Sequence, residues 1–333
     1  MMDSYSPRQL CALLAAALAA PLVTVCSAVT WPWVLLGAAV AAIPLFYIYR
    51  SMGPTALPQG LGPAELLTTA WGKMLGKWLA LASWLWLVLT VALTASMAVT
   101  AFPRDNAFPL IPMLLLILAA VASSQGAAAT CRFGATLFLA VAPMISLVLA
   151  FGTTDVELRA LRPDGTAMES LGPLTVLLIP AAAFYLRDGL TQRKTAWFRW
   201  YLLIAGAGVA VSLVCVGALG LPLAQASSNA FWLMSRSISV LGVMERFEVV
   251  ISALLSISFC CLLAFLLAAA RQALTCAAPN APAHKTVWGS AALAAAFLWL
   301  VPSVPNWGWI VGNLAVLAIV PATTLFLVEL KKS

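Results

Sequence analysis

The segment Val249–Ala270, VVISALLSISFCCLLAFLLAAA, runs for 22 residues between Glu248 and Arg271 without a charged side chain. A helix of this length rises about 30 Å, which is the thickness of the hydrocarbon core of a bilayer. Its polar side chains are small hydroxyls and thiols, and hydroxyls can bond to the backbone of their own helix. We therefore interpret the segment as a membrane-spanning helix.

The composition of the whole chain extends this interpretation. Of the 333 residues, 63% are apolar and 9% are charged, and the mean hydropathy is +1.01. Soluble domains carry about 25% charged residues. These values exclude a soluble enzyme, a disordered chain and a nucleic-acid-binding protein. They also exclude an outer-membrane β-barrel, whose strands would alternate apolar and polar residues. The sequence predicts an all-α polytopic membrane protein.

Apolar runs separated by charges, proline and glycine predict ten transmembrane helices, and the length leaves room for about ten spans. The predicted helices are residues 8–28, 33–49, 74–101, 109–124, 131–151, 172–187, 197–219, 245–274, 286–301 and 307–329. They form a single transmembrane domain over residues 1–333, with repeat one at 8–151, an outer loop at 152–171 and repeat two at 172–329. We interpret the first run as a retained helix, because Val23-Thr24-Val25-Cys26 is a poor lipoprotein cleavage sequence.

The basic residues support an even number of crossings with both termini in the cytoplasm. With the N-terminus inside, 13 of the 18 Lys and Arg residues fall on the inner side, as the positive-inside rule requires. The inner residues are Arg8, Arg50, Lys73, Lys77, Arg132, Arg187, Arg193, Lys194, Arg199, Arg271, Lys285, Lys331 and Lys332. The outer residues are Arg104, Arg159, Arg162, Arg236 and Arg246.

Three connections are long enough to hold structure of their own. Residues 152–171 and 220–244 are predicted to lie outside, and the second contains Phe231-Trp232-Leu233-Met234, which predicts a short helix over the outer face. The largest inner loop covers residues 50–73. Within it, Pro63-Ala64-Glu65 is typical of a helix start, with proline and an acid in the first turn.

Prolines interrupt helices one and six at matching positions. Five helices on each side of the outer loop predict inverted repeats, in which such breaks mark the substrate site. Pro21 follows Ala19-Ala20, and Pro180 lies within Ile179–Ala183. Each proline removes a backbone hydrogen bond at a cost of about 3 kcal/mol in a soluble helix, and the freed groups could hold a zwitterion. Two packing kinks are the alternative, because proline is common in membrane helices.

The predicted site is a small cavity between the two breaks and nearby hydroxyls. Thr90 and Thr94 lie on helix three, and Ser252 and Ser256, four residues apart, share a face of helix eight. Bonding of these hydroxyls to their own helices is the alternative. Tyr185 could cap or gate the cavity. The candidate substrate-binding residues are Ala19, Ala20, Pro21, Leu22, Val23, Thr90, Thr94, Ile179, Pro180, Ala181, Ala182, Ala183, Phe184, Tyr185, Ser252 and Ser256.

Catalytic and metal-binding patterns are missing from the sequence. No ionisable side chain falls in the middle of a predicted span, which argues against a proton relay, and His284 is placed in an inner loop. The seven cysteines form no CxxC or Cys/His cluster. We expect no catalytic residue, no metal, no cofactor and no enzyme activity. A Na⁺ site built from carbonyls of helix one and hydroxyls such as Ser256 stays open.

Three sequence blocks occur in register along the chain. They are Ser6-Pro7-Arg8-Gln9-Leu10, Trp71-Gly72-Lys73-Met74-Leu75-Gly76-Lys77-Trp78, and Glu245-Arg246-Phe247-Glu248 opening a helix that ends in Ala268-Ala269-Ala270-Arg271-Gln272. In order and spacing they resemble the spore germination permeases, the B subunits of germinant receptors. The resemblance implies the amino acid–polyamine–organocation (APC) superfamily. Its LeuT-like fold has ten helices in a five-plus-five inverted repeat, with helices one and six broken. The chain departs from this pattern at both breaks. The family usually has glycine in the break of helix one, where this chain has Ala19-Ala20-Pro21. Helix six of the family commonly carries a Phe-x-Gly-Glu-like stretch, whereas residues 179–185 of this chain contain neither glycine nor glutamate.

The resemblance implies a membrane subunit of a germinant receptor that binds a small nutrient such as an amino acid. The expected location is the bacterial cytoplasmic membrane or the spore inner membrane. The expected partners are the lipid bilayer, a large soluble-headed membrane subunit and a lipoprotein, without nucleic acid. An amino acid transporter (permease) of the same superfamily is the alternative, and a ligand-free structural membrane subunit is a second alternative.

Overall fold

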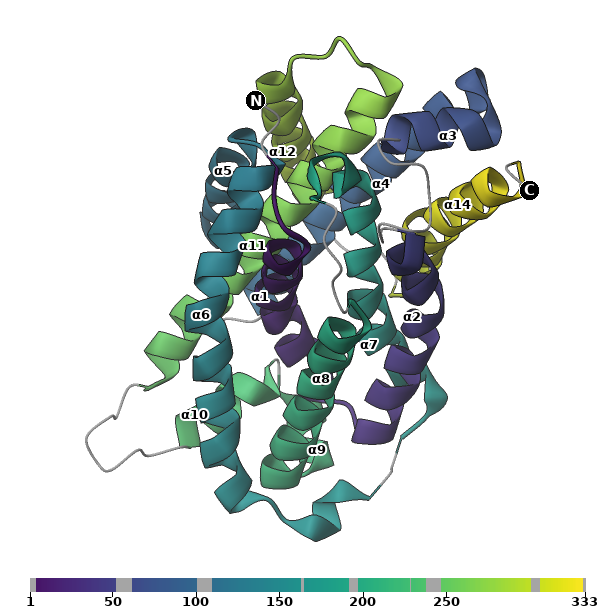
Figure 1. The fold of residues 1–333 in the computed structure, drawn as a ribbon. Coiled ribbons are helices and arrows are strands. Elements are labelled where there is room, and N and C mark those ends of the chain that lie inside the picture. The colour runs from purple at the N-terminus through teal and green to yellow at the C-terminus, as the bar shows by residue number, and fades with distance from the viewer. Residues whose placement is uncertain are drawn as a thin grey trace.

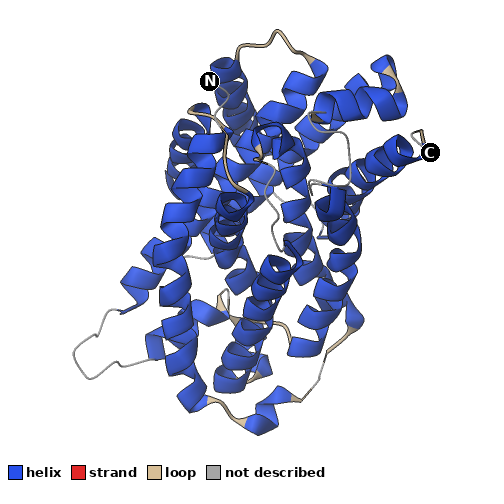
Figure 2. Ribbon diagram, viewed as in Figure 1, coloured by secondary structure: helices blue, strands red, loops and turns tan. Residues whose placement is uncertain are grey.

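The structure is a computed structural model that describes residues 4–51, 62–100, 110–162, 165–191, 197–227, 229–237, 247–300 and 306–331. Within these residues the regular structure is helical (Figure 2), apart from one isolated β-bridge between Tyr5 and Leu190. Five short segments depart from the α-helix: four 3-10 helices and one π-helix, η5.

The N-terminal half comprises α1 (Pro7–Cys26), α2 (Trp31–Ser51), α3 (Pro63–Trp71), α4 (Lys73–Thr100), α5 (Leu110–Ser124) and α6 (Ala127–Gly152). Three 3-10 turns follow, η1 (Thr153–Asp155), η2 (Leu158–Leu161) and η3 (Ala167–Ser170). The C-terminal half comprises α7 (Leu171–Leu178), η4 (Ile179–Gly189), α8 (Trp197–Leu219), α9 (Leu221–Ala226), α10 (Ala230–Ser237), α11 (Phe247–Ala277), α12 (Ala283–Leu300), α13 (Asn306–Gly312), η5 (Asn313–Ile319) and α14 (Val320–Leu330).

Each of the ten predicted segments contains helix, although two are composite. The sixth consists of α7 and η4, and the tenth consists of α13, η5 and α14. Eight helices of the described chain are long and apolar enough to cross a membrane, and α5 is a shorter apolar helix. The count of ten spans and the inverted repeat stay predictions.

The smaller expectations have mixed outcomes. α3 begins at Pro63, where the Glu65 carboxylate accepts a hydrogen bond from the Gly62 amide at 3.3 Å. A short helix, α10, forms around Phe231–Met234 as predicted, and its place on the outer face stays a prediction. The placement of His284 in a loop is wrong, because α12 begins at Ala283 and the imidazole lies 6.2 Å from the Trp288 ring. α12 begins about one turn before the predicted start at residue 286, because Ala283 and His284 can both adopt the helical conformation.

Both chain ends lie at the same end of the helical bundle. In Figure 1 they occupy the upper half of the view with α3, whereas α9 and α10 lie in the lower half. Termini at one end are what an even number of crossings requires. Which end faces the cytoplasm stays a prediction from the basic residues.

The centre of the bundle is formed by α1, α7–η4 and α11. In both Pro7–Cys26 and Ala167–Gly189, 72% of the most apolar window is buried, the largest share among the eight candidate spans. α1 packs on α6, α11, α8 and α7. The close crossing with α6 needs glycine, because a Cβ at Gly134 would lie 2.9 Å from the Leu13 Cα. The two proline-bearing segments are therefore the most enclosed parts of the fold.

Candidate functional site

The sixth segment changes its helix type at Pro180. α7 ends at Leu178, the Ile179 amide bonds to the Val176 carbonyl, and η4 continues as a 3-10 helix to Gly189. Proline has no amide hydrogen, so an α-helix could not continue its bonding pattern through this position. A 3-10 helix turns by about 120° per residue instead of about 100°, so the side chains after Pro180 point in directions that an α-helix would not give them. The predicted interruption is present.

The interruption predicted in helix one takes a different form. α1 continues as an α-helix through Pro21, so the expectation of a broken helix one is wrong at the level of secondary structure. Instead, the Ser258 hydroxyl of α11 engages its backbone. This hydroxyl donates to the Ala16 carbonyl at 2.6 Å and accepts from the Ala20 amide at 2.8 Å. In a regular α-helix the Ala20 amide would donate to the Ala16 carbonyl. Here the Ser258 hydroxyl, 238 residues away in sequence from Ala20, bonds to both groups of this helical hydrogen bond.

Ser258 also compensates for Pro21. Without an amide hydrogen, Pro21 leaves the Ala17 carbonyl without its usual helical donor. The Ser258 oxygen lies 3.4 Å from this carbonyl oxygen. The hydroxyl therefore contacts the Ala17 carbonyl that Pro21 leaves without a donor, and α1 stays helical.

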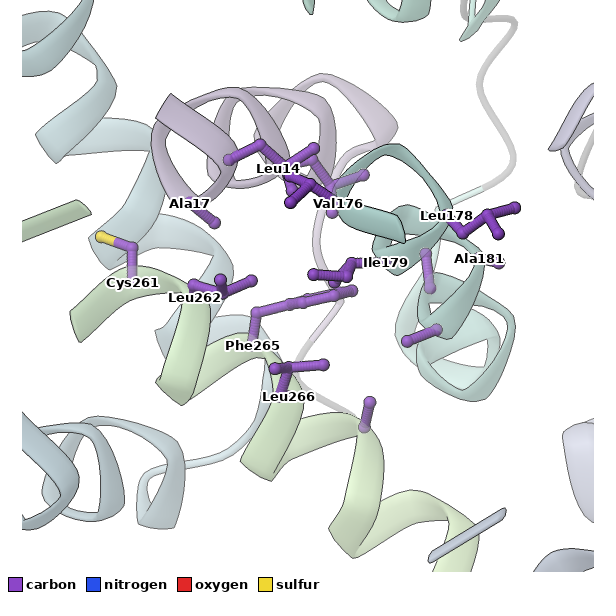
Figure 3. Close-up of a cluster of buried hydrophobic side chains, with 14 of the residues drawn as sticks. Leu14, Ala17, Val176, Leu178, Ile179, Ala181, Cys261, Leu262, Phe265 and Leu266 are labelled. Atoms are coloured by element: carbon purple, nitrogen blue, oxygen red, sulfur yellow. The ribbon is translucent and has the colours of Figure 1, made fainter. Parts of the chain in front are cut away.

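Aliphatic and aromatic side chains fill the space between these backbones. Figure 3 shows Leu14 directed toward Val176 and Phe265 of α11 lying alongside Ile179. These four side chains are at most 3% exposed. The junction of α1, α7–η4 and α11 is therefore closed and apolar in this structure.

Two tyrosines bond to carbonyls of η4 from outside the junction. The Tyr49 hydroxyl of α2 donates to the Pro180 carbonyl at 3.1 Å, and the Tyr5 hydroxyl donates to the Leu186 carbonyl. The Tyr5 backbone also pairs with the segment after η4, with 2.9 Å bonds to the Gly189 carbonyl and the Thr191 amide. Burial, with Cys131 and Asp188 nearby, raises the pKa of the Tyr5 phenol, so it stays a neutral donor. The chain before α1 thus covers one end of η4.

The predicted site residues do not all face one cavity. Ala19, Leu22 and Val23 line a cavity of about 120 Å³ between α1, α6 and α8. Ala20 instead meets Ser258. The residues from Ile179 to Tyr185 are all buried and do not line this cavity.

The predicted hydroxyls mostly bond within their own helices. Thr90 donates to the Trp86 carbonyl at 2.9 Å, and Thr94 donates to the Thr90 carbonyl at 2.8 Å. Ser256 donates to the Ser252 carbonyl at 2.9 Å. The alternative of back-bonding therefore holds for three of the four predicted hydroxyls.

The buried hydroxyls of Tyr185 and Ser83 have no partner in bonding geometry among the described residues. Tyr185 and Ser83 of α4 are each at most 1% exposed. They lie close together. Buried hydroxyls without partners are costly. Tyr185 is therefore a polar contact point within the predicted set.

Sequence reasoning missed two polar residues that contact the junction. The candidate set does not contain Ser258, although its spacing to Cys261, Leu262 and Phe265 puts it on the buried face of α11. The set does not contain Asn313 either. Its side-chain carbonyl accepts from the Trp86 indole at 2.9 Å, and its amide donates to the Thr175 carbonyl at 3.3 Å.

Asn313 connects α4 and α7 at the first residue of the π-helix η5. Asn313 lies against α7 at Thr175, which is four residues before Ile179. π-Helical turns frequently mark functional sites. An amide inside an otherwise apolar run was the available signal for this residue.

A bundle of apolar helices centred on two proline-bearing segments is the architecture of a multi-pass membrane protein with a LeuT-like fold. The solved structure of MhsT in complex with L-phenylalanine has a similar fold, with a TM-score of 0.64 and 13% sequence identity. The alignment covers 97% of this chain and 88% of MhsT. No protein-family model and no curated protein matches the sequence. The likeness shows that the two chains share a fold.

We predict that Ser258→Ala destabilises the protein more than Ser256→Ala does. The first substitution removes a hydroxyl that satisfies the Ala20 amide and the Ala16 carbonyl, with an expected loss of about 1–3 kcal/mol in the free energy of unfolding. The second removes a bond within one helix, with an expected loss below about 0.5 kcal/mol. Unfolding in a detergent series measures both. Equal stabilities of the two variants would show that the α11–α1 bond is unimportant.

Proposed function

We propose that the chain is a nutrient-binding membrane subunit of the germinant-receptor kind. It binds a small amino-acid-like ligand at the junction of α1 and α7–η4 and passes the signal to partner subunits. The observation that carries the proposal is the change from α-helix to 3-10 helix at Pro180, next to the hydroxyl-engaged backbone of α1. The three sequence blocks that resemble germination permeases supply the receptor role.

The backbone around the two prolines could bind both ends of an amino acid. Amide groups at a helix interruption favour a carboxylate, and carbonyl groups favour an ammonium group. In the closed structure these groups bond to Ser258 and Tyr49. A ligand that binds there exchanges contacts with these hydroxyls, so binding requires α7–η4 to move relative to α1 or α11.

The surrounding side chains favour an apolar ligand. Leu14, Val176, Ile179 and Phe265 provide a dry aliphatic and aromatic wall. A ligand with a charged side chain would bind weakly here, because an apolar wall offers no partner to offset the desolvation of the charge. L-Leucine and L-phenylalanine are therefore the first probes, with L-glutamate and L-lysine as the charged comparison.

We predict that Pro180→Ala weakens binding of the apolar amino acid at least tenfold. Alanine restores an amide hydrogen, so α7 can continue as an α-helix and rotate the residues after position 180 away from the junction. Pro21→Ala should weaken binding several-fold, because α1 then needs the Ser258 hydroxyl less. Pro143→Ala is the matched control, since Pro143 is an exposed proline inside α6. Equilibrium binding to purified protein in nanodiscs measures all three.

The same binding assay can reject the proposed site. If Pro21→Ala and Pro180→Ala both bind as the unaltered protein does, the prolines are packing kinks. If none of the amino acids binds the unaltered protein, the chain is a structural subunit without a ligand.

An amino acid transporter is the second candidate function. It is favoured by the LeuT-like fold shared with MhsT, whose structure was solved with L-phenylalanine. Uptake of labelled ligand into proteoliposomes separates the two candidates, because a receptor binds without net flux. Saturable uptake that Pro180→Ala abolishes would assign the chain to transport.

Ligand binding should be independent of pH between about 6 and 8. Residues 14–23, 176–185 and 258–266 carry no ionisable side chain apart from buried thiols and Tyr185, and the nearest charged residues, Arg187 and Asp188, lie at the far end of η4. Burial raises the pKa of the Tyr5 phenol, so its hydrogen bond to the Leu186 carbonyl stays intact over this range, because the phenol loses its proton only well above its usual value of about 10. Affinity measured across this range tests the statement. A steep change that Asp188→Asn or Glu248→Gln removes would reveal proton coupling.

A further inference from the structure

A second cavity lies between α2 and α8, and the Tyr49 side chain separates it from Pro180 of the proposed ligand site. It has a volume of about 280 Å³ and lies between the C-terminal half of α2 and the N-terminal turns of α8. Its lining includes Ala42, Phe46, Tyr49, Trp197 and Tyr201. Arg50, in the last turn of α2, lines it as well.

Aromatic contacts fix the shape of this groove. The rings of Tyr49 and Trp197 stack at 4.9 Å with an interplanar angle of 2°. Phe46 and Phe198 meet edge to face at 6.2 Å. Tyr49 is held by its bond to the Pro180 carbonyl, and the Tyr201 hydroxyl bonds to the Ala38 carbonyl. The groove is therefore preformed, with a flat aromatic floor.

The groove opens onto a face that meets hydrocarbon. Ile43 and Phe46 of α2 are 74% and 56% exposed, and Phe198 and Leu202 of α8 are 49% and 52% exposed. Both helices are candidate membrane spans. Large apolar side chains exposed on spans face acyl chains, and a groove between such side chains has room for one of them.

The rim of the groove is positively charged. Arg50 is exposed and has no hydrogen bond or ion pair to another described residue. The Glu329 carboxylate, which contacts this part of α2, already accepts a 3.0 Å bond from Tyr47. An anionic headgroup at the rim would therefore meet the Arg50 guanidinium group, which has no partner among the described residues.

We propose that this groove is a binding site for an anionic phospholipid of the inner leaflet. One acyl chain lies along the aromatic floor, and the headgroup phosphate accepts hydrogen bonds from Arg50. Basic pockets between spans at the cytoplasmic surface suit anionic headgroups, and the positive-inside rule assigns Arg50 to that surface. Because Tyr49 contacts both the groove and Pro180, the lipid would lie one side chain away from the proposed ligand site.

Native mass spectrometry with added phosphatidylglycerol or phosphatidylcholine of the same chain length tests the site. The unaltered protein should bind phosphatidylglycerol about fivefold more tightly, as expected for one cation near an anionic headgroup. Arg50→Gln should remove this preference. Arg132→Gln should keep it, because Arg132 is an exposed cation of α6 outside the groove. Ala42→Phe, which fills the groove, should weaken binding of both lipids.

Several results would overturn the proposal. Equal binding of the two lipids, an equal loss in Arg50→Gln and Arg132→Gln, or unchanged binding in a folded Ala42→Phe variant would each do so. Dimers that Ala42→Phe dissociates would assign the groove to a second copy of the chain instead. Thermal unfolding of each variant confirms that it is folded before its lipid binding is compared.

Discussion

The structure depends on one constraint, which is that backbone amides and carbonyls inside a membrane need hydrogen-bond partners. No water is available there, and each unpaired group costs several kcal/mol. Pro21 and Pro180 each remove one donor from the most enclosed segments of the fold. At Pro21 the Ser258 hydroxyl bonds to the backbone of α1, and at Pro180 the Ile179 amide bonds to the Val176 carbonyl that proline leaves without its usual donor. The Tyr49 hydroxyl adds a bond to the Pro180 carbonyl.

These hydroxyl bonds decide how the central helices behave. A hydrogen bond from a side chain can be exchanged for one from a ligand without unfolding the helix, whereas an internal helical bond cannot be exchanged in this way. The apolar contacts of Phe265 and Ile179 close the same junction by packing alone. Few polar contacts therefore hold the closed state, and a zwitterionic ligand could replace them.

The sequence predicts the helical segments well because hydropathy and charge act locally. The interruption at Pro180 follows from a local rule for the same reason, and so does the start of α3 at Pro63. The continuity of α1 through Pro21 could not be predicted, since it depends on a hydroxyl 238 residues away.

The candidate site was predicted less completely than the fold. Helical spacing alone shows which serines share a face, but it does not show which face meets α1. The choice of Ser256 instead of Ser258 is the result, because Ser256 bonds within its own helix. Asn313 was missed because its partners, Trp86 and Thr175, come from two other segments.

Hydrogen exchange of the purified protein, measured with and without an apolar amino acid, tests the central claim most directly. We expect L-leucine or L-phenylalanine to change amide exchange in peptides that cover residues 14–23 and 176–186. We expect unchanged exchange in α12, which lies outside the proposed site. Binding that leaves both peptides unchanged, or changes α12 alone, would contradict a ligand site at the junction of α1 and α7–η4.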